Sequence, residues 1–120
     1  MTRGEHVTRD DFADEFAELA WRAGIRDTCV LDFSLEHEPG GRNYADVDPW
    51  ELHFRFAPEA PRLPAANRRG LIMHEIGHVL CREFPGGGTE DDADRAAERA
   101  FGVRITYDRR WPGKGLQRAD

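Results

Sequence analysis

The spacing of apolar residues near the start of the chain predicts an amphipathic helix. Between Thr8 and Gly24 apolar side chains recur at helical spacing, and acidic residues occupy the early turns, where they suit the helix dipole. Thr8 and Asp11 have the spacing of a capping box, and Gly24 suits the C-terminal end. The apolar face consists of Phe12, Phe16, Leu19, Ala20 and Ala23.

Further along, apolar and polar residues alternate strictly, which is the pattern of half-buried strands. In the first alternating segment, the side chains expected on the inward side of a strand are those of Cys29, Leu31, Phe33 and Leu35. A short extended piece around 44–47 follows, and then "WELHFRF" alternates with Trp50, Leu52, Phe54 and Phe56 inward. We therefore expect a short antiparallel sheet, and "WELHFRF" is a candidate for its edge strand, along which an extended peptide can align.

The second half of the chain predicts two consecutive helices joined by a glycine-rich turn. The first runs from about Pro64 through Leu80, because proline is tolerated in a first helical turn. "FPGGGT" ends it, and Thr89 with Asp92 offers a capping box for a helix that ends near Gly102. The apolar face of this last helix is mostly alanine, which lets it lie close to the helix before it.

Length and charge narrow the classes of function. The 120 residues suffice for one α+β domain with one modest core, spanning 1–120 and ending in a polar tail at 109–120. A formal net charge of -6 argues against general binding to nucleic acid or to a membrane surface. The N-terminus lacks the apolar core of a secretion signal, so we expect a cytoplasmic protein. The two cysteines, Cys29 and Cys81, are expected to be free thiols.

Three ionisable residues interrupt the apolar segment "LIMHEIGHVL" and indicate a metal site. His74 and His78 are four residues apart, so on a helix their imidazoles project from one face, with Cβ atoms about 6 Å apart. This spacing suits two ligands of one zinc ion per chain, with Glu75 placed as the general base that activates a zinc-bound water. The pattern arises by chance in a chain of this composition with a probability of roughly 2%. Its position on an apolar helix strengthens the prediction, because a buried cluster of ionisable groups is costly unless a metal compensates it.

A zinc site needs at least one more protein ligand, and the sequence leaves several candidates. The metzincin extension and the three-histidine endoribonuclease pattern both need a histidine that this chain lacks. A deformylase-like arrangement would use Cys29, which instead fits a core strand. The following helix offers Glu90 and Asp94 on one face, and Asp91 about 100° around the helix from Glu90.

"HEIGH" followed by "EDDAD" resembles the gluzincin metallopeptidases, and most of all the compact ImmA/IrrE-type enzymes and the minigluzincins. The similarity covers about 50–102. The resemblance implies a small zincin-like domain, with Glu90 as the third zinc ligand and Asp94 as an acceptor that orients a ligating histidine, plausibly His74. Only eleven residues separate His78 from Glu90, and a symmetric hairpin would place Asp94 level with His78 as an alternative ligand.

The resemblance implies hydrolysis of peptide bonds in a protein or peptide substrate, with a regulatory protein such as a transcriptional repressor as one candidate. The alternative is a zinc-stabilised adaptor domain that binds a protein partner without cleaving it; a third is a metal-free domain with a buried polar cluster. Tyr107 or Arg104 is a candidate for stabilising the oxyanion. The remaining histidines, His6, His37 and His53, are expected on the surface.

Overall fold

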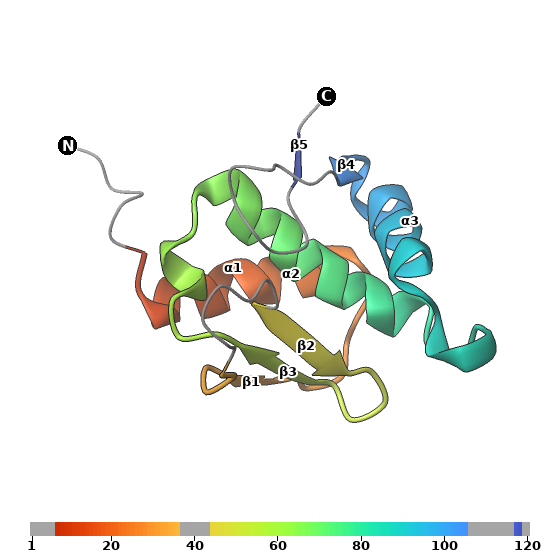
Figure 1. Ribbon diagram of the computed structural model, residues 1–120, viewed down its shortest axis with the longest axis horizontal. Helices are drawn as coiled ribbons and strands as arrows, with labels where there is room; N and C mark the ends of the chain where they lie inside the picture. Colours follow the sequence, from red (N-terminus) through yellow and green to blue (C-terminus); the bar gives the residue numbers. More distant parts are fainter. Residues whose placement is uncertain (1–6, 37–43, 106–116, 119–120) are drawn as a thin grey trace.

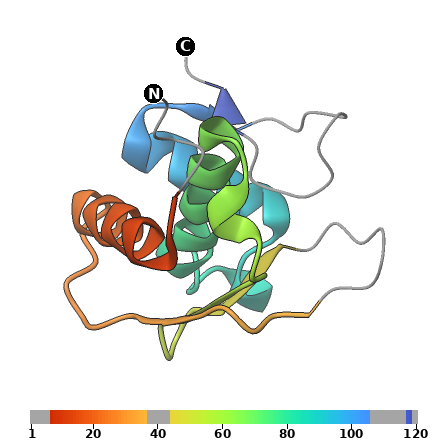
Figure 2. The same ribbon diagram turned by 90° about the vertical axis from the view of Figure 1, so that its left-hand side faces the viewer.

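Three helices lie on one side of a small β-sheet in the computed structural model, which describes residues 7–36, 44–105 and 117–118 (Figure 1 and Figure 2). This arrangement confirms the expected α+β class. The helices are α1 (Arg9–Arg22), α2 (Ala65–Leu80) and α3 (Glu90–Phe101), and the strands of the sheet are β1 (Val30–Asp32), β2 (Ala45–Asp48) and β3 (His53–Phe56). Two short 3-10 turns, η2 (Ala60–Arg62) and η3 (Pro85–Gly87), flank α2, and a two-residue ladder joins β4 (Arg104–Ile105) to β5 (Gln117–Arg118).

Both predicted capping boxes are present and set where α1 and α3 begin. The hydroxyl of Thr8 accepts a hydrogen bond from the backbone N–H of Asp11 at 3.0 Å, and the carboxylate of Asp11 accepts one from the N–H of Thr8. Thr89 and Asp92 make the same reciprocal pair at the start of α3. The cap at Thr89 therefore makes Glu90 the first residue of α3.

The sheet is mixed, so the expectation of an antiparallel sheet was wrong. The strand order is β1-β3-β2, in which β3 pairs parallel with β1 and antiparallel with β2. Strand β2 lies at the opposite edge of the sheet from β1. The short turn at 49–52 then places β3 between these two strands. As the centre strand, β3 has both edges paired, which also excludes "WELHFRF" as the edge along which a substrate aligns.

Trp50 was expected to point inward, but its side chain is 60% exposed because residues 49–52 form the turn between β2 and β3. The carboxylate of Asp48 holds this turn by accepting hydrogen bonds at 3.1 Å from the backbone N–H groups of Trp50 and Glu51. Strand β3 therefore starts only at His53, and the inward alternation holds for Phe54 and Phe56, which are both fully buried.

The core is a set of aromatic rings between α1 and the sheet. Phe16 packs edge-to-face on Phe54 with ring centroids 4.6 Å apart, and Phe12 does the same on Phe56 at 4.8 Å. Between Phe12 and Phe16 in the sequence, the carboxylate of Glu15 accepts hydrogen bonds from Arg68 and Arg69, which links α1 to the first turns of α2. Among the described residues, no helix is both long and apolar enough to cross a membrane.

Replacing Phe54 with alanine should lower the free energy of unfolding by about 3 to 5 kcal/mol, because it opens a cavity in this core. Phe84, whose side chain is 48% exposed, is the matched control, and Phe84→Ala should change stability by less than about 1 kcal/mol. Chemical denaturation followed by tryptophan fluorescence measures both values. Equal losses in the two variants would contradict the assignment of the core.

Candidate metal centre

A glycine near the C-terminal end of α2 brings α2 and α3 into backbone contact. The side of Gly77 that would carry a β-carbon faces the main chain of Ala93, and a methyl group there would overlap the carbonyl oxygen of Ala93. Ala93 and Ala97 are fully buried at this crossing. The prediction that small residues let the two helices lie close together is therefore confirmed, and the first turn of α3 is held against the face of α2 that carries the histidines.

The turn between the two helices is equally tight. Gly86, Gly87 and Gly88 all have positive φ angles, between +73° and +87°, which favour glycine. Gly88 lies directly on the buried thiol of Cys81, because a β-carbon at position 88 would overlap the sulfur atom. The short glycine turn thus reverses the chain within a few residues and delivers Glu90 opposite the end of α2.

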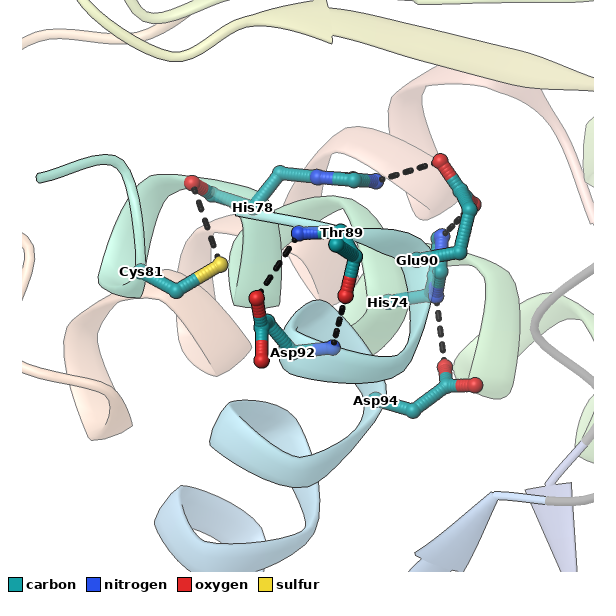
Figure 3. A network of polar contacts seen from close by, with 7 residues as sticks. All are labelled: His74, His78, Cys81, Thr89, Glu90, Asp92 and Asp94. Atoms are coloured by element: carbon teal, nitrogen blue, oxygen red, sulfur yellow. Dashed lines mark hydrogen bonds and ion pairs between the residues drawn. The ribbon is translucent and has the colours of Figure 1, made fainter. Parts of the chain in front are cut away.

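Glu90 lies between the two imidazoles of α2 (Figure 3). One carboxylate oxygen is 2.9 Å from Nε2 of His74, and the other is 3.3 Å from Nε2 of His78. One ligand atom from each of these three residues lies within 4.8 Å of the others. Donor atoms around a tetrahedral zinc ion with bonds of about 2.0 Å are separated by about 3.3 Å, and the two distances from Glu90 to the imidazoles are close to that value.

Asp94 contacts the opposite side of the His74 ring. Its carboxylate lies 2.6 Å from Nδ1 of His74, one helical turn after Glu90 on α3. An Nδ1–H that donates to Asp94 leaves the Nε2 lone pair directed toward Glu90 and His78. The hairpin therefore places Asp94 level with His74, and the alternative in which Asp94 lies level with His78 does not occur.

The surroundings of His74 favour a positive charge. Burial by itself lowers the pKa of the imidazole, but the hydrogen bond to Asp94 and the negative charges of Glu75, Asp94 and Glu90 outweigh burial and raise the pKa above 6.5. A divalent cation held by neutral imidazoles would satisfy the same carboxylates. The donor set of two imidazoles and one carboxylate is one that zinc accepts, so these residues fit a zinc ion.

Glu75 lines the cleft beside this cluster. Glu75 is only 3% exposed, although it carries a carboxylate. Nearby residues of α2, Met73 and Ile76, are buried and apolar. The cleft has a volume of about 260 Å³ and lies between β2 and the two helices. Its lining residues are Ala45, Asp46, Val47, Pro49, Glu75, His78 and Glu90.

The other candidate residues do not join the cluster. Cys29 is a half-buried free thiol and Cys81 a buried one, and burial raises the pKa of both. His53 faces Asp32 on the outer side of the sheet, with 3.5 Å between Nε2 and the carboxylate. Arg104 is exposed on β4 and does not line the cleft, and Asp91 is not part of the cluster.

Several earlier candidates fall outside the described residues: His6, His37 and Tyr107. The same holds for the tail at 109–120, of which only the backbone of Gln117–Arg118 is described.

Sequence reasoning missed two features of the site. The first is the role of Gly77: a glycine inside a helix costs about 1 kcal/mol relative to alanine, so its place between two histidines was itself a signal of close packing. The second is β2, one of the two outer strands of the three-stranded sheet, whose residues Ala45, Asp46 and Val47 form one wall of the cleft. Its sequence "ADVD" is too short to show which strand would lie at the edge.

The chain matches no protein-family model, no curated protein and no solved structure. The resemblance to the gluzincins therefore rests on the residues of the two helices alone.

Replacing Gly77 with alanine tests the close contact between α2 and α3, because the contact decides whether the change raises or lowers the stability of the protein. On an open helix surface this change would stabilise the protein by about 1 kcal/mol, because alanine is the better helix former. Here the added methyl group must push α3 away, so we expect a loss of about 1 to 3 kcal/mol together with weaker metal binding. Thermal unfolding and zinc titration measure the two effects, and a stabilised variant would contradict the close contact.

Comparing Glu90→Ala with Asp94→Ala separates a ligand from a residue that orients one. Loss of Asp94 should weaken zinc binding by about 10- to 100-fold, because the ring of His74 then loses its fixed orientation. Loss of Glu90 should weaken it more, because a donor to the metal disappears. Competition with a chromophoric chelator measures both affinities. A larger loss in Asp94→Ala would reverse the two assignments.

Proposed function

We propose that this protein is a zinc-dependent metallopeptidase that cleaves peptide bonds in a protein or peptide substrate. The observation that carries the proposal is the meeting of His74, His78 and Glu90 around one point, with Glu75 lining the same cleft. A site that only stabilised the fold would need the three ligands but not the carboxylate of Glu75, which is costly to bury.

The residues of the site would have three roles: holding the ion, orienting a ligand and transferring a proton. His74, His78 and Glu90 would hold the ion, and Asp94 would hold the His74 ring in place. A bound zinc ion supplies a Lewis acid that polarises the substrate carbonyl and lowers the pKa of a water molecule from 15.7 to about 7. Glu75, at the wall of the cleft, accepts a proton from the attacking water and passes it to the leaving amine.

The position of β2 supports a peptide as the substrate. It is one of the two outer strands of the three-stranded sheet and lines the cleft, so its backbone can pair with an extended segment of another chain. Main-chain pairing of this kind binds a peptide without reading its sequence. The scissile bond would then lie beside Glu75 and His78.

Replacing Glu75 with glutamine tests the proposal, because the amide keeps the shape of the side chain and cannot accept the proton. We expect Glu75→Gln to bind one zinc ion per chain and to lose at least about 100-fold in kcat on a mixture of peptides from a digested cell extract. Glu83→Gln is the matched control, since Glu83 is exposed and does not line the cleft, and it should keep full activity.

Full activity in Glu75→Gln would contradict the proposed role of Glu75. A wild-type protein that binds zinc and cleaves no peptide would instead indicate the adaptor domain, whose partner binding should be unchanged by Glu75→Gln.

A further inference from the structure

A tryptophan side chain is exposed to solvent at one end of the cleft. Trp50 directly follows Pro49, which lines the cleft, and 60% of Trp50 is exposed. Its backbone is fixed by the hydrogen bonds that Asp48 accepts from the turn. A large aromatic side chain held in this way presents a rigid apolar face at low cost in conformational entropy.

Arg82, just after α2, stacks on that tryptophan. Its guanidinium carbon lies 4.9 Å from the centroid of the Trp50 ring, and one N–H donates a 3.0 Å hydrogen bond to the carbonyl of Pro49. A guanidinium has five N–H donors. Within the part of the chain that the structure describes, no carboxylate forms an ion pair with Arg82. A cation with spare donors is therefore fixed at the end of the cleft.

The charges elsewhere along the cleft have the opposite sign. The ionisable residues that line it with His78 are Asp46, Glu75 and Glu90, and none of the described lysines or arginines lines it. Asp46 is already paired with Arg55. A bound divalent cation would offset the charges of Glu75 and Glu90, and an acidic side chain of a substrate would be attracted at the Arg82 end.

A second stacked pair of an arginine and a tryptophan lies at the end of α1. Arg26 stacks on Trp21 at 3.5 Å, and it donates to the carbonyl of Trp21 itself. Stacking at the end of a helix therefore occurs without any link to the cleft, and a cation there also suits the helix dipole. Arg82 differs because it is hydrogen-bonded to Pro49, a residue that lines the cleft, so its charge lies next to the Pro49 end of the cleft.

Two acidic residues, Glu83 and Asp27, share a groove of about 460 Å³ with Arg26 and Arg82. Both side chains are exposed, whereas the guanidinium of Arg82 is fixed by its ring and its carbonyl partner.

We propose that Trp50 and Arg82 form a specificity-determining pair, which selects substrates carrying an acidic side chain at the position that lies over the Pro49 end of the cleft. This inference rests on the proposed peptidase function. The guanidinium pairs with the substrate carboxylate, and the Trp50 ring holds the guanidinium and shields one side of the pair from water.

Cleavage of a mixed peptide library by the full-length, zinc-loaded protein tests this pair. Mass spectrometry of the products should show aspartate and glutamate enriched at one position relative to the cleaved bond. Two synthetic peptides that differ only by glutamate or glutamine at that position should then differ by about tenfold in kcat/KM, which is the size of one partly exposed charge-assisted contact.

In Arg82→Gln the two peptides should have the same kcat/KM. The value for the glutamine peptide should equal that of the wild-type protein. Arg26→Gln is the matched control and should keep the tenfold preference. Trp50→Leu keeps the charge of Arg82 and should reduce the preference for the glutamate peptide. This variant serves as the test if Arg82→Gln fails to fold or to bind zinc.

An absent enrichment, or one that persists in Arg82→Gln, would overturn this pair and leave the peptidase function standing. Absence of all cleavage by the zinc-loaded wild type would overturn both.

Discussion

The close contact between α2 and α3 at Gly77 is the constraint on which the rest of the site depends. With no side chain at position 77, the two helix backbones touch at Ala93, and the first turn of α3 faces the histidines of α2. A β-carbon at position 77 would overlap the carbonyl oxygen of Ala93, so a larger residue would push the helices apart and move Glu90 away from the histidines. The tight glycine turn and the capping box at Thr89 complete the constraint, because they set the rotation of α3 and direct Glu90 toward His74 and His78.

This geometry concentrates negative charge around a buried imidazole. Glu75, Glu90 and Asp94 all act on His74, which is fully buried, and together they raise its pKa despite the burial. Such an arrangement is costly in an apolar core unless a positive charge is present. The proposal of a bound divalent cation gives a single reason for the three carboxylates and the two imidazoles, whereas a role in packing alone would be met by apolar side chains of the same size.

The features that could be predicted from the sequence are those encoded locally. Both capping boxes, the bounds of the three helices and the inward face of Phe54 and Phe56 follow from short-range patterns, and the structure confirms them. The sheet order could not be predicted, because strands of three or four residues carry no signal for their partner. The outward turn of Trp50 was missed because alternation continues through "WELHFRF", although the Asp48–Pro49 pair marked a turn. The contacts of Glu90 and Asp94 with His74 were expected from the resemblance to the gluzincins, but the residue spacing alone left Asp94 level with either histidine. The close helix contact at Gly77 decides between the two, and its role was not recognised from the sequence.

The central claim is that α2 and α3 together hold one zinc ion through two imidazoles and one carboxylate. X-ray absorption at the zinc K-edge of the one-to-one complex tests it most directly, because imidazole rings and sulfur atoms scatter differently. The account predicts two imidazole nitrogens at about 2.0 Å with oxygen ligands and no sulfur. A sulfur ligand at about 2.3 Å, or a folded protein that takes up no zinc, would contradict it.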